Sequence, residues 1–307
     1  MKIAMVGAGG VGGYFGAGLA RGGADVHFLA RGAHLAAMRA NGLRIEGGAA
    51  PLVLAPVNAT DDAASIGVAD LVVIGVKLWD TAAALEHIRP TVGPATTLIS
   101  FQNGVTKSDL LRASFPQAHV MDGVAYVATT IDRPGVIKRT GPLERLIFGE
   151  IGGGASAVGE KLLAFAMKGG INAELSTDVR REIWQKFVFL IGLSASTTSM
   201  RSRIGPIRAN SQTRAFLLDI MREVVAVGRA LGVALTEDYA EQRLAFADGV
   251  SPDMTSSMHH DLERGNRLEL PWLSGAVVEL GQRGGVPTPL NRAVRDILTL
   301  QASGNSA

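Results

Sequence analysis

One lysine stands beside the most apolar stretch of this 307-residue sequence. Lys186 precedes the run FVFLIGL, residues 187–193, and the segment continues into hydroxyl residues up to position 199. At helical spacing the lysine shares a face with Ser194 and Thr197. Two interpretations remain open. Either the ammonium reaches water along its flexible stem, or an apolar wall lowers its pKa and makes it a proton donor near neutral pH.

A glycine-rich hexapeptide near the N-terminus has the composition of a phosphate-binding turn. The sequence GAGGVG, residues 7–12, follows the apolar run KIAMV and opens a small-residue helix. In such a turn Gly7 makes the bend, Gly9 lets a pyrophosphate approach the backbone, and Gly12 lets the helix pack on the strand. Gly10 and Val11 supply N–H groups at the helix N-terminus. We therefore expect a dinucleotide site here; the alternative is an ordinary strand–helix turn.

Arg31 indicates which dinucleotide is bound. NAD sites usually carry an acid at the end of the second strand, about 20 residues after the glycines. The corresponding segment here is DVHFLAR, which ends at Arg31 and contains no acid at that end. Because a guanidinium grips a phosphate group, we expect NADP (NADPH) as the cofactor. The alternative is a surface arginine.

Two further polar residues follow predicted strands. Lys77 comes after DLVVIGV, and Asn103 with Gly104 comes after TTLISFQ. Ligands of open α/β sheets bind outside the carboxyl ends of the strands, so Lys77 and Asn103 are expected to face the dinucleotide. A solvated strand-end lysine and a turn-forming Asn-Gly pair are the alternatives.

The order of the elements indicates an α/β fold. Strand-like and helix-like segments alternate through the first half, which predicts a Rossmann-type, doubly wound parallel sheet. Residues 119–150 indicate β-rich segments separated by Arg-Pro-Gly and Thr-Gly-Pro turns, which finish the same sheet. Beyond the segment ending near 176 the pattern is helical. We predict an NADP-binding domain at 1–176 and an all-helical domain for substrate binding and dimerisation at 177–307.

Composition excludes several classes of function. The formal net charge is +2 with scattered basic residues, which argues against nucleic acid as a partner. No run is long enough to predict a membrane helix. The chain lacks cysteine, which excludes thiolate chemistry and is typical of a cytoplasmic protein. His259 and His260 are adjacent, so on a helix they point about 100° apart and do not predict a metal site.

These motifs together resemble the ketopantoate reductase (2-dehydropantoate 2-reductase) family. The resemblance covers nearly the whole chain and is carried, besides the glycine turn and Arg31, by VKLWDT at 76–81, FQNGV at 101–105, WQKF at 184–187, SSMHHDLERGNRLEL at 256–270 and GVPTPLNRAV at 285–294. It implies an NADPH-dependent enzyme with a Rossmann domain and a helical C-terminal domain.

The resemblance also implies roles for individual residues. Lys186 matches the lysine that protonates the substrate's carbonyl oxygen, and Glu269 matches an acid near substrate and cofactor ribose. Asn103 matches a residue that contacts both, and Ser257 matches a serine that binds the substrate. Lys77 matches a lysine in the cleft, and Arg31 the arginine on the 2′-phosphate.

The sequence departs from the family pattern in the helix that carries the lysine. Members acting on ketopantoate have asparagines one and two turns after it, where this chain has Leu190 and Ser194. Ser194 keeps one hydrogen-bonding group for the substrate, whereas Leu190 keeps none. A substrate whose buried polar groups stay unpaired binds less tightly, so the comparison predicts the type of reaction better than the substrate.

The sequence therefore predicts a reductase that transfers hydride from NADPH to the ketone of a small 2-oxo acid, most directly 2-dehydropantoate. A homodimer formed through the helical half is also expected. The alternatives are a reductase of another 2-oxo acid, a protein that senses NADP without turnover, and a structural protein that binds no nucleotide.

Overall fold

The computed structural model describes residues 1–48 and 50–304. The chain forms two compact units. Unit 1 comprises Met1–Asn103 and Lys107–Glu182, and unit 2 comprises Gly104–Thr106 and Ile183–Ala307. The long helix α7 (Val179–Met200) therefore begins in unit 1 and continues in unit 2. The predicted domain boundary after residue 176 falls just before this helix and stays a prediction.

One sheet with a parallel centre forms the middle of unit 1. Its strands run in the order β4-β3-β9-β8-β7-β6-β1-β2-β5, and β10 pairs with β9. In chain order they are β1 (Lys2–Val6), β2 (Asp25–Leu29), β3 (Leu43–Glu46), β4 (Leu52–Leu54), β5 (Asn58–Thr60), β6 (Leu71–Ile74), β7 (Thr97–Ser100), β8 (His119–Arg133), β9 (Val136–Glu150) and β10 (Ala173–Leu175). The strands from β8 through β5 along this order pair in parallel. All four carboxyl ends that the cofactor prediction uses therefore meet at one edge.

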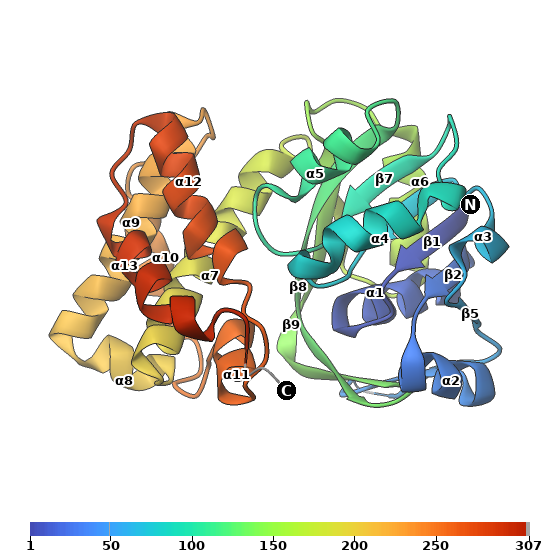
Figure 1. The fold of residues 1–307 in the computed structure, drawn as a ribbon, viewed down its shortest axis with the longest axis horizontal. Coiled ribbons are helices and arrows are strands. Elements are labelled where there is room, and N and C mark those ends of the chain that lie inside the picture. The colour runs from blue at the N-terminus through green and yellow to red at the C-terminus, as the bar shows by residue number, and fades with distance from the viewer. Residues whose placement is uncertain (49, 305–307) are drawn as a thin grey trace. The chain divides into compact units, whose positions relative to one another are not determined.

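Helices cover both faces of this sheet (Figure 1). Alternate residues of β1 point to opposite faces: Ile3 and Met5 pack with α1 and α6, whereas Ala4 and Val6 pack with α3, α4 and α5. The helices of unit 1 are α1 (Gly10–Arg21), α2 (Gly32–Asn41), α3 (Ala63–Ile66), α4 (Thr81–His87), α5 (Lys107–Ser114) and α6 (Ala157–Lys168), with 3-10 turns at η1 (Leu78–Asp80) and η2 (Arg89–Thr91).

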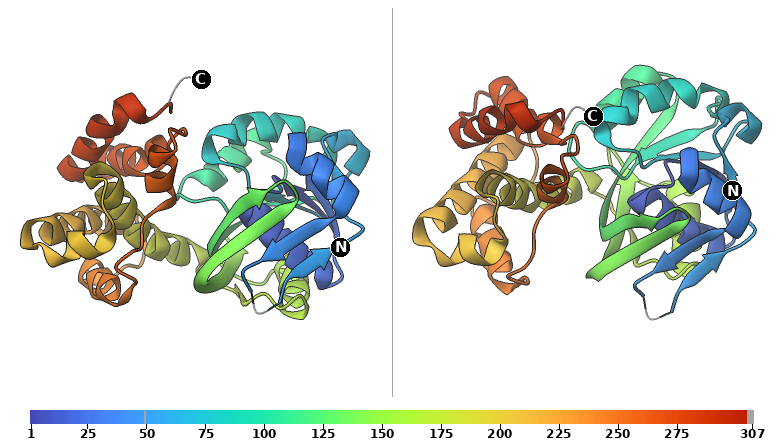
Figure 2. Two further views of the ribbon diagram at one scale, coloured as in Figure 1. Left: turned by 90° about the horizontal axis from the view of Figure 1, so that it is seen from below. Right: turned by 60° about the horizontal axis from the view of Figure 1, so that its bottom comes forward.

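A long hairpin extends the sheet beyond its parallel part. Strands β8 and β9 pair antiparallel, and β9 also pairs in parallel with β3 (Figure 2). The predicted Arg-Pro-Gly turn lies between the two strands. The predicted Thr-Gly-Pro break is instead contained within β9, where the pairing skips from Thr129–Arg139 to Val127–Glu144. A bulge absorbs the extra residues, so one strand replaces two predicted segments.

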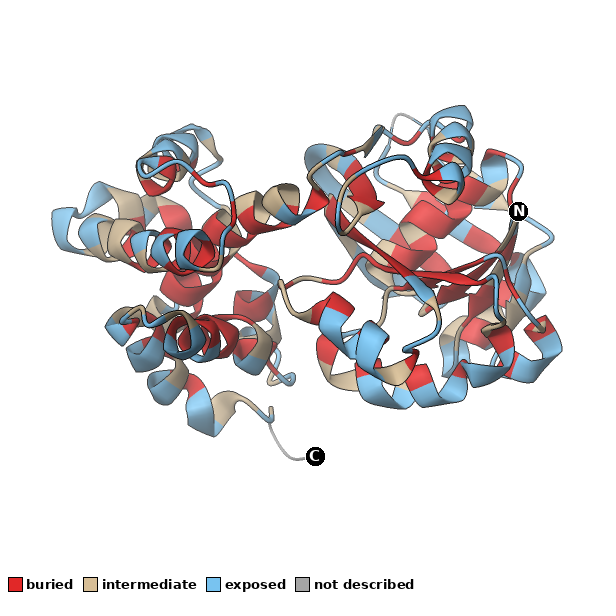
Figure 3. Cartoon of the chain, turned by 90° about the horizontal axis from the view of Figure 1, so that it is seen from above, coloured by how far each residue is buried: buried red, intermediate tan, exposed pale blue. Residues whose placement is uncertain are grey.

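The described residues of unit 2 form helices, 3-10 turns and the loops that connect them. Besides α7 the unit contains α8 (Ile204–Ala209), α9 (Ser211–Ala230), α10 (Tyr239–Gly249), α11 (Ser257–Glu263), η3 (Leu270–Trp272), α12 (Ser274–Gly284), α13 (Pro289–Leu298) and η4 (Thr299–Gln301). Helix α9 contacts α8, α10, α12 and α13. In each unit the buried residues lie on the helix faces that point inward, and in unit 1 they also lie on the strands (Figure 3). The predicted fold class is thus confirmed. None of the helices in residues 1–48 and 50–304 is long and apolar enough to cross a membrane.

Candidate functional site

The glycine turn connects β1 to α1 with an open approach to the helix N-terminus. Gly7 has φ +94°, a conformation that strongly favours glycine. A Cβ on Gly12 would lie 2.0 Å from the Gly7 carbonyl oxygen, so α1 packs on the turn only because this side chain is absent. Gly9 is the N-cap, and a Cβ there would meet no atom within 4 Å. The first amides of α1 have no partner within the helix and can therefore bind an anion.

Two neighbours hold the outer side of this turn. The carbonyl oxygen of Thr129 on β8 lies 2.5 Å from the place of a Gly10 Cβ, so Gly10 is packed directly against the hairpin. The ring of His34 on α2 joins the turn to the hairpin end. Its Nδ1 accepts from the Gly135 amide at 3.1 Å, and its Nε2 therefore donates to the Ala8 carbonyl at 2.9 Å. These bonds select the neutral imidazole, and burial lowers the pKa of His34. Sequence reasoning missed His34.

The strand ends of β6 and β7 are held against the glycine turn by contacts within unit 1. A Cβ on Gly7 would lie 2.8 Å from Val76 Cγ1, which shows how closely the two loops pack. The Gln102 amide donates to the Val76 carbonyl and to Thr81 Oγ1, each at 2.8 Å. Lys77 directly follows Val76, and Asn103 directly follows Gln102. The structure therefore brings both predicted loops to one rim of unit 1, the edge at which β6 and β7 end. Lys77 is exposed, with its Nζ 5.2 Å from the ring centre of Trp79, and Asn103 is half-buried.

Arg31 lies just after β2, at the N-cap of α2. Its side chain is 86% exposed, and Nη2 lies 3.3 Å from an oxygen of Asp80 in η1. The guanidinium is therefore accessible to a ligand, but it already has an anionic neighbour. Sequence reasoning missed Asp80, which lies 49 residues further along the chain.

The helix α7 carries Lys186 and Ser194 in unit 2. Lys186 is half-buried, and its neighbours Phe187 and Val188 belong to the core of this unit. Ser194 is 1% exposed, and its Oγ has no hydrogen-bond partner among the described residues. The hydroxyls of Ser196 and Thr198 on the same helix also lack a partner, so this property does not distinguish Ser194 from its neighbours. Leu190, between them, is partly buried against the same core.

A polar contact ties α11 to α7 and places Ser257. Thr197 Oγ1 lies 3.1 Å from Oγ of Ser256, which caps α11, and the Thr197 carbonyl lies 2.8 Å from Nδ1 of His259. Ser257, the first residue of α11, is exposed. His259 is thus engaged in helix packing, and the described residues contain no group of three potential metal ligands.

Glu269 is buried at the entry to η3, with 6% of its surface exposed. Its carbonyl accepts from the amides of Trp272 and Leu273 at 3.0 and 3.1 Å, which closes the 3-10 turn. In the structure Pro271 lies in this turn, and α12 begins at Ser274.

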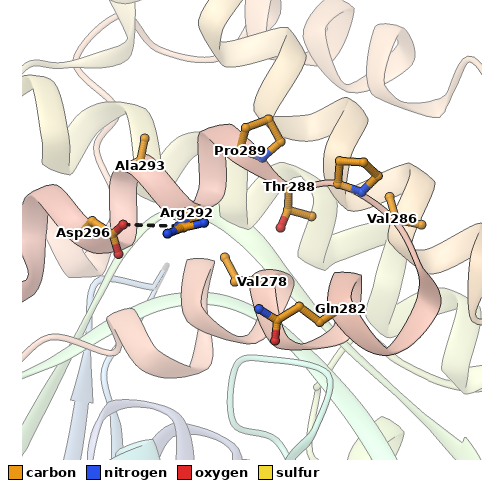
Figure 4. A pocket seen from close by; sticks show the side chains of 9 residues that line it. Val278, Gln282, Val286, Thr288, Pro289, Arg292, Ala293 and Asp296 are labelled. Carbon is orange, nitrogen blue, oxygen red and sulfur yellow. Dashed lines mark ion pairs between the residues drawn. The ribbon is translucent and has the colours of Figure 1, made fainter.

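A separate groove of about 500 Å³ lies between α12 and α13. Figure 4 shows Val278 and Gln282 of α12 opposite Arg292 of α13. Arg292 Nε lies 3.6 Å from a carboxylate oxygen of Asp296, one turn along the same helix. None of the predicted site residues lines this groove.

A glycine turn at the first strand of a sheet with a parallel centre gives unit 1 the topology of the Rossmann class. The profile "Ketopantoate reductase PanE/ApbA" matches residues 3–153, and its C-terminal counterpart matches residues 178–302. A 2-dehydropantoate 2-reductase of Mesorhizobium japonicum is 35% identical over 96% of this chain and 95% of its own length. The chain belongs to the ketopantoate reductase family of oxidoreductases.

Solved structures agree with this assignment. The PanE/ApbA family ketopantoate reductase of Ralstonia eutropha JMP134 has a TM-score of 0.89 and 33% identity, covering 98% of both chains. A D-mandelate dehydrogenase, solved with NADH and anilino(oxo)acetate, has a TM-score of 0.88 and 20% identity over 98% of both chains. At that identity the likeness concerns the fold alone.

Proposed function

We propose that this protein is an NADPH-dependent reductase that converts the ketone of a small 2-oxo acid into an alcohol, most directly 2-dehydropantoate into pantoate. The observation that carries the proposal is the rim of unit 1, where the open N-terminus of α1 is packed beside the loops of Lys77 and Asn103. Such a rim fits a dinucleotide, because free amides and cationic or amide side chains bind phosphates and sugars.

The bound cofactor supplies hydride for the ketone carbon, and the protein's own groups manage the charge that develops on the oxygen. Lys186 donates a proton to this oxygen, which completes the new hydroxyl group. By its match to the family's acid, Glu269 would contact the substrate and the ribose of the cofactor. Asn103, Ser257 and the otherwise unpartnered Ser194 hydroxyl bind the substrate's polar groups.

NADPH is proposed over NADH because Arg31 follows β2 in place of an acid and exposes its guanidinium. We also propose a cytoplasmic enzyme and a homodimer. The absence of cysteine supports the first of these. The exposed side chains of Ile297 and Leu300 on unit 2 support the second, because they leave apolar surface to cover.

A second candidate is a reductase of a less hydroxylated 2-oxo acid. Leu190 offers the substrate no hydrogen bond where ketopantoate-reducing members have asparagine. D-mandelate dehydrogenase has the same fold, so the fold alone does not determine the substrate.

A substrate screen tests both candidates. Oxidation of NADPH and of NADH is followed with 2-dehydropantoate and with a panel of aliphatic and aromatic 2-oxo acids. We expect the highest kcat/KM with 2-dehydropantoate and NADPH. A larger kcat/KM for an acid without the 4-hydroxyl group would favour the second candidate. Tight NADPH binding without acceleration by any acid would indicate a sensor and refute both.

A further inference from the structure

A buried ion pair in unit 1 takes no part in the chemistry described so far. Lys107, the first residue of α5, is 1% exposed. Its Nζ donates to the carbonyls of Gln102 at 3.1 Å and Gly123 at 2.5 Å, and lies 3.4 Å from Oδ1 of Asp122 on β8. The other Asp122 oxygen accepts from Ser108 Oγ. The ammonium is thus fully coordinated by the protein.

Stability alone is a poor reason to keep a cation in this place. Desolvation lowers the pKa of Lys107, and the attraction of Asp122 opposes this effect. A buried ion pair is often no more stabilising than apolar residues of the same size, although removing one partner alone is costly. The two backbone carbonyls that bind the ammonium indicate another role.

The ammonium closes the base of one loop. Lys107 and Gln102 are the residues that flank Asn103–Thr106, and the bond from Lys107 Nζ to the Gln102 carbonyl joins the two ends of this loop. The Gln102 side chain is fixed separately by Val76 and Thr81. Both the backbone and the side chain of Gln102 are thus fixed, and Asn103 is the next residue.

We propose that Lys107 is a positioning residue, whose ammonium clasps the 103–106 loop so that Asn103 is held ready for the cofactor and the substrate. This inference rests on the proposed function, in which Asn103 contacts both molecules. Lys107 itself touches neither, and it acts only through the two carbonyls that it binds.

The test uses a double variant that separates the positioning of the 103–106 loop from the stability of the protein. Lys107→Met combined with Asp122→Asn removes both charges, so no unpaired buried charge is left to unfold the protein. The Asp122→Asn change keeps a side-chain oxygen that can accept from the Gly123 amide, a bond that the Asp122 carboxylate makes at 2.8 Å. The single variant Lys107→Met keeps the unpaired carboxylate. Leu111→Ala is the matched control, because it creates a cavity in the same helix at a fully buried position.

Two measurements are made on each full-length variant. Hydrogen exchange reports the backbone of residues 102–106 without cofactor, and fluorescence titration gives the Kd for NADPH. We expect the double variant to show about tenfold faster exchange in this segment and about tenfold weaker NADPH binding, as the loss of one charged hydrogen bond predicts. KM for the 2-oxo acid rises with it, and kcat changes less. Leu111→Ala lowers Tm but leaves the Kd within about twofold.

Recovery of both Tm and wild-type Kd in the double variant would mean that the pair serves packing only, and would overturn the inference. Unchanged exchange at 102–106 would also overturn it. If wild-type protein binds no NADPH, the proposed function fails and so does the role assigned to Asn103, while the exchange data still decide whether Lys107 clasps the loop.

Discussion

The cofactor preference gives the sharpest single test, through Arg31→Ala. The change should leave the fold intact, because the side chain is 86% exposed and caps no helix amide. Its ion pair with Asp80 is a surface pair, and such pairs contribute about 0–1 kcal/mol. Any large effect on cofactor binding therefore comes from the lost contact with the cofactor.

The size of the effect follows from the type of contact. A hydrogen bond to a charged group contributes about 1.5–3 kcal/mol, and exposure to solvent places this one toward the lower end. With about 1.4 kcal/mol per factor of ten, the Kd for NADPH should rise about 10- to 30-fold. NADH lacks the 2′-phosphate, so its Kd should change by less than about twofold. The difference should shrink at high salt, which screens exposed charges.

Asp80→Asn is the control in the opposite direction. It removes the carboxylate that competes with a phosphate for Arg31, so the Kd for NADPH should fall a few-fold. Fluorescence titrations of the three proteins with both cofactors measure these values. Equal losses for NADPH and NADH in Arg31→Ala, or a wild-type preference for NADH, would refute the assignment of Arg31 to the 2′-phosphate.

Three further changes test other parts of the structure. Lys186→Ala should lower the single-turnover rate of NADPH oxidation by about 10²–10⁴, the usual contribution of a general acid; an unchanged rate removes it from the mechanism. Burial lowers the pKa of His34 in the folded protein, so the unfolded chain takes up the proton first. The free energy of unfolding therefore falls as the pH drops below about 6.5. Between pH 7.5 and 5, the Tm of His34→Asn should fall less than the Tm of wild type. The Glu223 carboxylate accepts from the amides of Leu290 and Asn291 in the first turn of α13, at 2.8 and 3.0 Å. Glu223→Gln should therefore lower the free energy of unfolding in urea by about 1 kcal/mol. A urea midpoint equal to that of wild type would contradict this capping role.

Local patterns in the sequence predicted those parts of the fold that depend on neighbouring residues. The glycine turn, the parallel strands and the helical second half are all encoded within short windows of sequence. The break expected inside β9 was wrong because a Thr-Gly-Pro signal identifies a turn but does not distinguish it from a bulge within a paired strand. That choice depends on β8, which supplies the pairing partner.

The missed residues depend on partners that are distant in sequence. The role of His34 depends on its hydrogen bond with Gly135, 101 residues away. The ion pair that competes for Arg31 depends on Asp80, which is also distant in sequence. Lys107 lies four residues after Asn103, just beyond the FQNGV motif, yet nothing in that motif indicates a buried cation. Two of its partners are on β8, and their proximity is a property of the folded sheet.

The membership of Gly104–Thr106 in unit 2 has a consequence for dissecting the protein. Val105 packs against the helical core, although the rest of that core begins at residue 184. A C-terminal fragment would lack this side chain, and an N-terminal fragment would carry it without its apolar surroundings. Each unit is therefore built from two separate segments of the chain, and neither can be expressed whole as one continuous fragment.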